Sequence, residues 1–318
     1  MNLRIGSRGS QLAMWQANHI AELLLAQGHT VEIEIIKTTG DQLQDISFAQ
    51  VGSKGMFTKE IEEALADGRV DLAVHSLKDL PTELPEPFVL AATPSRVDPR
   101  DVFVSANFAN LSALPSNAKV GTSSQRRRAQ LKALRPDLIA MEFRGNVDTR
   151  LRKLAEGQVD AILLAAAGLD RLGKTDWVRE RLDPRNFCPA AGQGALGIET
   201  RKDDVATIEA LAFLDHADTR FAVTSERAAL AALGGGCQVP IGIHCRPEFP
   251  ADGVGTAWNE IFGIVASPES GQVIRAHLHA PRANSDPETL GKMIAKILLD
   301  GGAGKLLLAA VKTSVEEA

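Results

Sequence analysis

The chain has 318 residues, of which 44% are hydrophobic and 24% are charged, and its formal net charge is −5 at pH 7. This length and composition predict an ordinary folded protein of about two domains. The negative charge, the absence of tyrosine and the aromatic content of only 4% argue against a nucleic-acid-binding protein, which needs a basic surface and stacking side chains.

Membrane segments and a disulfide framework are also not expected. The longest wholly apolar run, Ala161 to Leu169, is far shorter than the roughly 20 residues of a membrane-spanning helix. The first residues, MNLRIGSRGS, lack the charged-then-apolar order of a signal peptide, and an odd number of cysteines favours reduced thiols. We therefore expect a cytoplasmic protein with no membrane and no nucleic-acid partner.

The N-terminal part of the chain predicts a strand, a helix and a second strand. Leu3 to Gly6 is the first strand, and Ser10 caps a helix whose apolar residues recur at helical spacing until Gly28. Residues 31–35 alternate as a strand, and residues 72–74 form a further apolar strand. Two strands joined through a helix normally lie parallel, so we expect a parallel α/β sheet.

A second run with the same order begins at residue 119. It consists of a strand, a helix and a strand, at Lys119 to Gly121, Gln125 to Leu134 and Leu138 to Phe143. The segments EALADGRVDLAV and KLAEGQVDAIL add to the similarity, because in each a helix ends at glycine and an aspartate opens an apolar strand. The chain therefore predicts two similar α/β domains, with crossings between them at residues 95–101 and 189–195, which are rich in turn-forming residues.

After about residue 217 the pattern changes to that of an α+β domain. We expect a long helix at Thr219 to Leu233, strands at residues 241–245, 261–266 and 273–279, and a final helix that starts at Ser285-Asp286-Pro287. The predicted division is residues 1–95 with 195–214 for domain 1, 96–194 for domain 2, and 215–318 for domain 3.

Two short polar loops precede predicted helices and are candidate anion sites. They are Ser7 to Ser10 and Thr122 to Ser124, and unpaired amides at a helix N-terminus attract anions. Serine and threonine also cap helices without a ligand, and a charge run is often a solvated helix face, so both interpretations stay open. Successive arginines repel the positive end of the helix dipole, which favours a bound anion, and guanidinium groups pair well with carboxylates. The arginines that fit this role are Arg126, Arg127, Arg144 and Arg150.

Two further segments carry reactive side chains. Lys78 and Asp79 follow the strand at residues 72–74, at the end where α/β proteins bind ligands, which makes Asp79 a candidate for proton transfer; the alternative is a surface turn before Pro81. Cys237 lies on a glycine turn that would expose its thiol, although free cysteines are more often buried. His244 and Cys245 do not complete a four-ligand zinc set with Cys237, so we expect no metal.

Taken together, nine motifs resemble those of porphobilinogen deaminase (hydroxymethylbilane synthase) over roughly residues 3 to 245. In chain order they are IGSRGSQLAMWQ, GSKGMFTKE, HSLKDLP, DPRD, VGTSSQRR, RGNVDTRL, AAAGLDRLG, PAAGQGALGIE and GGGCQVP. The resemblance implies two periplasmic-binding-protein-like α/β domains that form a cleft, plus a smaller α+β C-terminal domain. It also implies a transferase that joins four porphobilinogen molecules head to tail, with loss of ammonia at each step.

The resemblance further implies a covalent dipyrromethane cofactor, one per chain, held by a thioether to Cys237. Asp79 matches the family's catalytic aspartate. The positions implied to bind the cofactor, besides Cys237, are Lys78, Arg126, Arg127, Arg150, Ser124, Thr122, Ser123, Gly145 and Phe57. Those implied to bind the substrate are Arg8, Ser10, Arg144, Arg171, Gln16 and Lys54. A monomer is the family expectation.

Two positions depart from the family pattern. Gln50 stands where some members have lysine, and Arg128 adds a third arginine to the usual pair. In the family, the segment from Thr38 to Phe57 covers the cleft.

Two other classes of protein are alternatives to this family. One is a non-catalytic bilobal anion-binding protein, and the other is a cysteine hydrolase that uses Cys237. No arrangement in the sequence positions a base or an oxyanion hole for the hydrolase.

Overall fold

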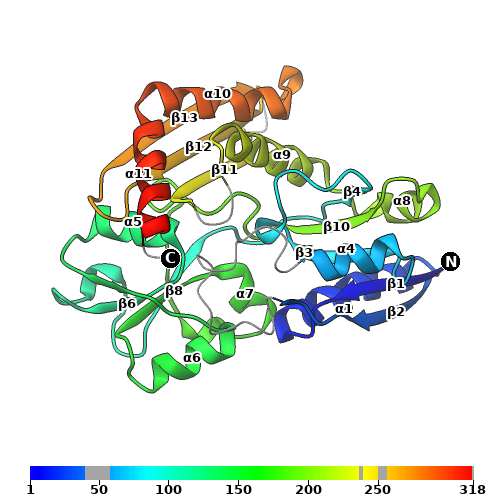
Figure 1. The fold of residues 1–318 in the computed structure, drawn as a ribbon, viewed down its shortest axis with the longest axis horizontal. Helices are drawn as coiled ribbons and strands as arrows, with labels where there is room; N and C mark the ends of the chain where they lie inside the picture. Colours follow the sequence, from blue (N-terminus) through cyan, green and yellow to red (C-terminus); the bar gives the residue numbers. More distant parts are fainter. Residues whose placement is uncertain (40–57, 236–238, 250–255, 317–318) are drawn as a thin grey trace.

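The computed structural model describes residues 1–39, 58–235, 239–249 and 256–316, with residues from 311 onward given by their backbone alone. Two sheets with their helices lie side by side, and a third sheet with the C-terminal helices lies above them in Figure 1. Within the described residues, no helix combines the length and the apolar character needed to cross a membrane.

The first sheet has five strands in the order β2-β1-β3-β10-β4. β1 is parallel to β2 and β3, as predicted, whereas β10 is antiparallel to β3 and β4. The sheet is therefore mixed, and the expectation of a parallel sheet was incomplete. Its elements are β1 (Asn2–Ser7), α1 (Gln11–Ala26), β2 (Thr30–Ile35), α4 (Lys59–Ala66), β3 (Leu72–Ser76), the 3-10 turn η1 (Leu77–Asp79), β4 (Phe88–Ala92), β10 (Leu196–Arg201), α8 (Val205–Leu211) and η4 (Ala212–Leu214).

Helices cover both faces of this sheet. The apolar stripe of α1, which includes Ile20 and Leu24, packs on one face, and Ile61 and Leu65 of α4 pack on the other. The predicted start of α1 is confirmed, because the Ser10 hydroxyl accepts a hydrogen bond from the Ala13 amide. The helix stops just before Gly28, whose φ of +81° is in the region that favours glycine.

The second sheet repeats the first in strand order and direction, which confirms the predicted repeat. Its order is β7-β6-β8-β5-β9, with β6 parallel to β7 and β8 and with β5 antiparallel to β8 and β9. β7 is shorter than the strand predicted there. The elements are β5 (Asp101–Val104), η2 (Leu111–Ala113), β6 (Lys119–Gly121), α5 (Gln125–Leu134), β7 (Ile139–Met141), α6 (Val147–Ala155), β8 (Ala161–Ala165), α7 (Ala166–Arg171), η3 (Thr175–Trp177) and β9 (Val178–Arg181).

The chain passes between the two sheets twice, at the predicted crossings. Residues 93–100 lead from β4 to β5, and residues 182–195 lead from β9 to β10. In both sheets the strand that follows a crossing takes the antiparallel position next to β3 or β8. Each sheet is thus completed by the strand that enters it from the other domain.

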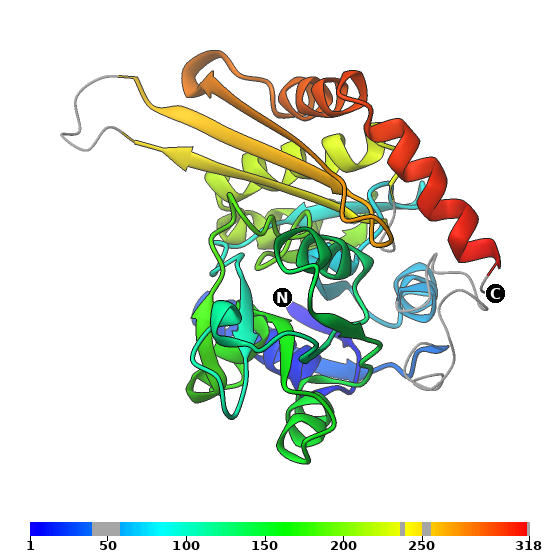
Figure 2. The same cartoon turned by 90° about the vertical axis from the view of Figure 1, so that its left-hand side faces the viewer.

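The third sheet, β11-β12-β13, is antiparallel, and α9 to α11 cover one of its faces. Its other face packs on Ala129 of α5 and on Cys188. Figure 2 shows the strands of this sheet, in yellow to orange, after a 90° turn of the view. The helix that starts after Asp286 is not the final one, because α11 follows it after a glycine turn. The elements are α9 (Ala217–Ala232), β11 (Ile241–Glu248), β12 (Trp258–Ala266), β13 (Val273–Pro281), η5 (Arg282–Asn284), α10 (Pro287–Asp300) and α11 (Ala303–Glu316).

Candidate active site

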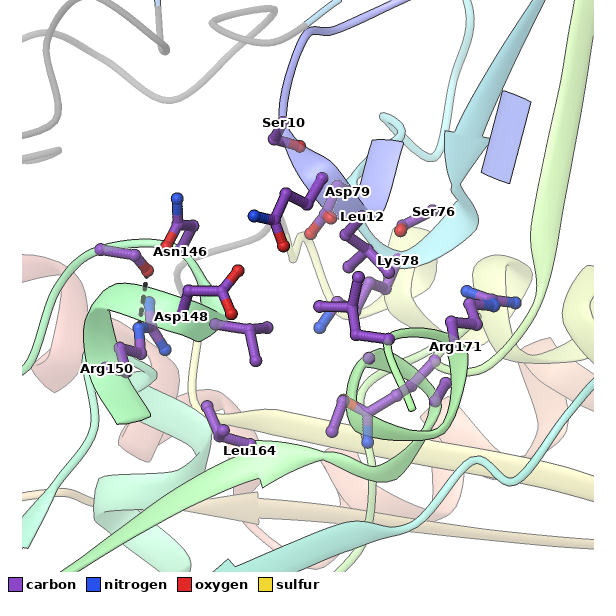
Figure 3. Close-up of a pocket in the computed structure, with 18 of the residues that line it drawn as sticks. Ser10, Leu12, Ser76, Lys78, Asp79, Asn146, Asp148, Arg150, Leu164 and Arg171 are labelled. Atoms are coloured by element: carbon purple, nitrogen blue, oxygen red, sulfur yellow. Dashed lines mark hydrogen bonds between the residues drawn. The ribbon is translucent and has the colours of Figure 1, made fainter. Parts of the chain in front are cut away.

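A cavity of about 360 Å³ lies between the first two sheets. This volume is within the usual range for sites that bind small molecules. Its walls come from the segments that follow β1 and β3 on one side and β6, β7 and β8 on the other (Figure 3). These are the carboxyl ends of parallel strands, where α/β sheets place their ligands, because the loops there can converge without blocking the sheet.

The cavity wall is strongly cationic although the whole protein is acidic. Two carboxylates accompany the cations: Asp79, and Asp148, which is paired with Lys174 at 2.7 Å. Most of the predicted basic site residues are therefore brought together here, from both domains. The cationic residues that line the cavity are Arg8, Lys78, Arg127, Arg144, Arg150 and Arg171.

The predicted polar loop residues divide into two groups. Ser10, Ser123 and Gly145 line the cavity. Ser124 does not, and its hydroxyl caps α5, while the Thr122 hydroxyl accepts a hydrogen bond from the Ser124 amide at 3.2 Å. For these two side chains the structure shows local capping.

The arginines at the start of α5 have an anionic partner within the protein, Asp101. Arg126 Nη1 lies 2.6 Å and Arg127 Nη2 lies 2.7 Å from its carboxylate oxygens, and all three side chains are buried. Burial alone would favour a protonated carboxyl group, but the two guanidinium groups hold the pKa of Asp101 well below its usual range. Arg126 also donates to the Cys188 carbonyl and does not line the cavity, whereas Arg127 does.

Lys78 and Asp79 lie in η1, directly after β3. Asp79 is exposed to the cavity, and burial beside Arg127 lowers the pKa of Lys78, although Asp79 opposes this shift. Asp79 also lines a smaller adjoining cavity of about 80 Å³, together with Gln16 and His75. Asp79 therefore lies where the two cavities meet.

Two further residues in the smaller cavity have defined partners. The Gln16 amide donates to the Ser76 hydroxyl at 2.7 Å. His75 is buried and pairs with the buried Glu199 at 3.0 Å.

Burial changes the pKa of two of the cavity arginines. Burial lowers the pKa of both Arg150 and Arg171 to about 10, so both remain charged at neutral pH. The Nε of Arg171 is buried without a hydrogen-bond partner among the described residues, while its Nη2 donates to the Gly194 carbonyl at 2.9 Å. A buried unpaired donor is costly, so this wall of the cavity is suited to an anion that accepts from it.

The sequence pattern did not predict that residues of the second crossing line the cavity. Gln193, Gly194 and Ala195 line the cavity. The buried Gln193 amide donates to Asp101 at 3.0 Å and to the Pro99 carbonyl at 2.7 Å, so it connects both crossings. The motif PAAGQGALGIE predicts a chain reversal and adds to the family resemblance, but it does not by itself indicate that these residues line the site.

Four predicted or noted residues fall outside the described part of the chain: Cys237, Phe57, Lys54 and Gln50. The other two cysteines are buried, and burial raises the pKa of the Cys188 thiol far above its normal value and that of Cys245 to about 12. Neither of these two thiols would be ionised at neutral pH. Arg128, the additional arginine, lies 3.5 Å from Glu142 and does not line the cavity.

The fold and the site define a bilobal α/β protein with a cation-lined cleft between its lobes. Two family models match the chain: "Porphobilinogen deaminase, dipyromethane cofactor binding domain" over residues 3–209 and "Porphobilinogen deaminase, C-terminal domain" over residues 220–300. The chain belongs to the porphobilinogen deaminase family, which consists of transferases of tetrapyrrole synthesis.

Curated relatives support the same assignment. The chain is 50% identical to porphobilinogen deaminase of Nitratidesulfovibrio vulgaris over 309 residues, which cover 96% of each chain. It is 48% identical to that of Neisseria meningitidis over 313 residues, which cover 98% of each. Among solved structures it is similar to the methionine binding protein MetQ, with 13% identity, a TM-score of 0.45, and coverage of 71% of this chain and 94% of that one.

Proposed function

We propose that this chain joins four porphobilinogen molecules head to tail, with loss of ammonia at each step, and releases hydroxymethylbilane by hydrolysis. The observation that supports this most strongly is the position of Asp79 in a cavity whose other charged groups are almost all cationic. A carboxylate in this position can stabilise positive charge that develops on a bound substrate.

The cationic wall suits the charge of the substrate and of its products. Each pyrrole carries an acetate and a propionate, so the growing chain gains two negative charges with each addition. We assign carboxylate binding to Arg8, Arg144 and Arg171, and to Ser10 at the N-terminus of α1, where backbone amides also favour anions. Gln16 lies next to this set in the smaller cavity, and Lys54 joins it as a prediction outside the described residues.

Asp79 is assigned the catalytic role. As ammonia leaves the aminomethyl carbon, positive charge spreads over the substrate pyrrole, and a carboxylate near the pyrrole NH stabilises that charge. When the terminal ring of the growing chain attacks this carbon, the attacking ring carbon loses a proton, which Asp79 can accept and pass on. The two events balance, because one proton leaves the ring for each ammonia released.

The residues of the cavity fit the cofactor that the first family model describes. A dipyrromethane carries four carboxylates. Arg127, Arg150 and the Nε of Arg171, which has no partner among the residues that the structure describes, offer donors for such groups. When bound, the cofactor supplies the ring carbon to which the first substrate is joined. We assign its attachment to Cys237 and its binding to the cavity residues Lys78, Arg127, Arg150, Ser123 and Gly145. Arg126, Thr122 and Ser124, which do not line the cavity, and Phe57, which is outside the described residues, complete the proposed set.

Replacement of Asp79 by asparagine tests the catalytic assignment. Asp79→Asn keeps the size of the side chain but removes its charge, so we expect the turnover of porphobilinogen to fall by at least about 100-fold. Hydroxymethylbilane formation would be measured, with circular dichroism as the control for folding. Near-normal product formation by a folded variant would refute the role of Asp79.

Intact-protein mass spectrometry tests the anchor. We expect the wild-type protein to carry the additional mass of one dipyrromethane and Cys237→Ser to lack it. Cys245→Ser is the matched control, because Cys245 is buried and should leave the added mass in place. An active wild-type protein without the added mass would contradict the cofactor assignment.

Three further assignments belong to this proposal. We keep the domain boundaries at residues 1–95 with 195–214, at 96–194 and at 215–318. We also expect a cytoplasmic protein that is a monomer; light scattering of the purified protein can check the monomeric state. The rival bilobal binding protein would bind porphobilinogen but release no ammonia from it.

A further inference from the structure

A cluster of two histidines and a glutamate lies on the third sheet, outside the cleft. His277 and His279 are two residues apart on β13, so their side chains point to the same face of the sheet. Glu260 on β12 is directly opposite His279 in the strand register and points to that face as well. Neither cavity of the proposed active site includes these residues.

The ligand atoms of the cluster converge on one point. His277 Nε2 lies 3.0 Å from Glu260 Oε1 and 3.0 Å from His279 Nε2, and His279 Nε2 lies 3.6 Å from the same Glu260 oxygen. In a tetrahedral zinc site the metal–ligand bonds are about 2.0–2.2 Å, so neighbouring ligand atoms are separated by roughly 3.3 Å. The three atoms already have nearly the spacing of one face of such a site.

We propose that Glu260, His277 and His279 bind one divalent transition-metal ion of the zinc type. Two imidazole nitrogens and one carboxylate oxygen suit zinc, and they do not suit magnesium or calcium, which prefer oxygen ligands alone. The fourth position opens to solvent, since the side chains of His277 and His279 are 53% and 41% exposed. The ion can therefore enter without unfolding of the sheet.

A second carboxylate lies next to one of the proposed ligands, on the side of its ring that faces away from the cluster. Glu248 Oε2 lies 3.7 Å from Nδ1 of His279, the ring nitrogen that does not face the cluster. Histidines that bind metals usually direct their second ring nitrogen to a carboxylate or carbonyl group, which fixes the ring and raises its basicity. Glu248 is placed for this role toward His279.

Two arginines share Glu260 and compete with a metal ion for it. Arg246 Nε binds Oε2 at 2.6 Å, the oxygen that does not face His277. Arg185 Nη2 binds Oε1 at 2.8 Å, the same oxygen that faces the histidines, but the Arg185 side chain is 55% exposed and can move into solvent. Removal of Arg185 should therefore tighten metal binding, whereas removal of a ligand should weaken it.

Zinc titration of the untagged holoenzyme, with its cofactor attached, tests the site. We expect one equivalent of Zn²⁺ by isothermal titration calorimetry and by metal analysis after dialysis. His277→Gln and His279→Gln should each weaken binding by at least about tenfold, because even the loss of an outer partner costs 10- to 100-fold. Arg185→Gln should strengthen binding severalfold. His19→Gln, a surface histidine stacked on Trp15 in α1, is the matched control and should bind zinc as the wild type does.

Cobalt substitution identifies the ligands. Co²⁺ at this site should give the visible absorption of a tetrahedral nitrogen and oxygen site, without the intense thiolate band that a cysteine ligand would cause. Absence of zinc uptake by the wild type, or uptake that is unchanged in the double variant His277→Gln with His279→Gln, would overturn the proposal. A thiolate band in the cobalt spectrum would overturn it as well.

Discussion

Arg171 lies in the cavity wall, and its buried Nε has no hydrogen-bond partner within the described part of the chain. Its Nη2 donates to the carbonyl of Gly194, which belongs to the second crossing. Arg171 Cζ also lies 5.8 Å from the centre of the Trp15 ring, so an aromatic side chain of α1 holds the guanidinium from another side. At the scale of single residues, Arg171 is therefore the clearest candidate to donate a hydrogen bond to a bound anion.

Arg171→Gln should therefore weaken substrate binding. A charge-assisted pair contributes about 1.5–3 kcal/mol, which corresponds to a loss in kcat/KM of roughly 10- to 100-fold. Steady-state kinetics with porphobilinogen measure the effect. Arg128→Gln is the matched control, because that arginine lies outside the cavity, and it should change kcat/KM less than about twofold. Equal effects of both substitutions would contradict the distinction.

The arginine run shows the limit of prediction at this scale. Sequence placed Arg126, Arg127 and Arg128 together and indicated that an anion should offset them. Only the structure shows that Asp101 is that anion for the first two, and that Arg127 alone of the three lines the cavity. The partner could not be predicted, because Asp101 lies on β5 and the arginines lie on α5, and only the folded sheet brings these elements together.

At the scale of elements, the second crossing packs tightly against the first. Gly194 has a φ of +88°, and a Cβ placed there would lie 2.6 Å from the Val97 carbonyl oxygen. The backbone of one crossing thus fills the space that a side chain on the other would need. This contact explains why glycine is required in the motif PAAGQGALGIE.

Gly194→Ala should lower the free energy of unfolding by more than a glycine-to-alanine substitution at a position where the added Cβ meets no other atom. We expect a loss of about 3 kcal/mol, from the left-handed backbone and from the displaced carbonyl group. Gly28→Ala is the control, because its φ is +81° but no atom lies within 4 Å of the added Cβ, and it should cost about 1 kcal/mol. Urea denaturation measures both. Equal losses would show that the crossings are not closely packed there.

At the scale of the whole molecule, one buried carboxylate joins both crossings to the third domain. Glu226 of α9 pairs with Arg96 of the first crossing at 2.7 Å and accepts from the Gly192 amide of the second crossing at 2.7 Å. It also accepts from the Cys245 amide of β11 at 2.8 Å. Burial disfavours its charge, but Arg96 and His244 outweigh this and lower the pKa of Glu226 to about 2.

The stability of the protein should therefore depend on pH through Glu226. Because the pKa is lower in the folded state than in the unfolded state, the stabilisation is present above about pH 4.5 and is lost as the pH falls toward 2. The difference corresponds to roughly 3 kcal/mol. Urea denaturation of the wild type and of Glu226→Gln between pH 6 and 3 should give a gap that narrows with acidity. Parallel curves would exclude this contribution.

The sequence by itself determined the local elements and the family. Caps such as Ser10, the periodicity of α1, the repeat at residue 119 and nine motifs depend on neighbouring residues, and their predictions were close to the observed bounds. The tertiary structure alone decided which strands complete each sheet, how Asp101, Gln193 and Glu226 pair, and which of the predicted residues line the cleft. These features join residues far apart in the chain, and pairing of that kind leaves no local pattern in a single sequence.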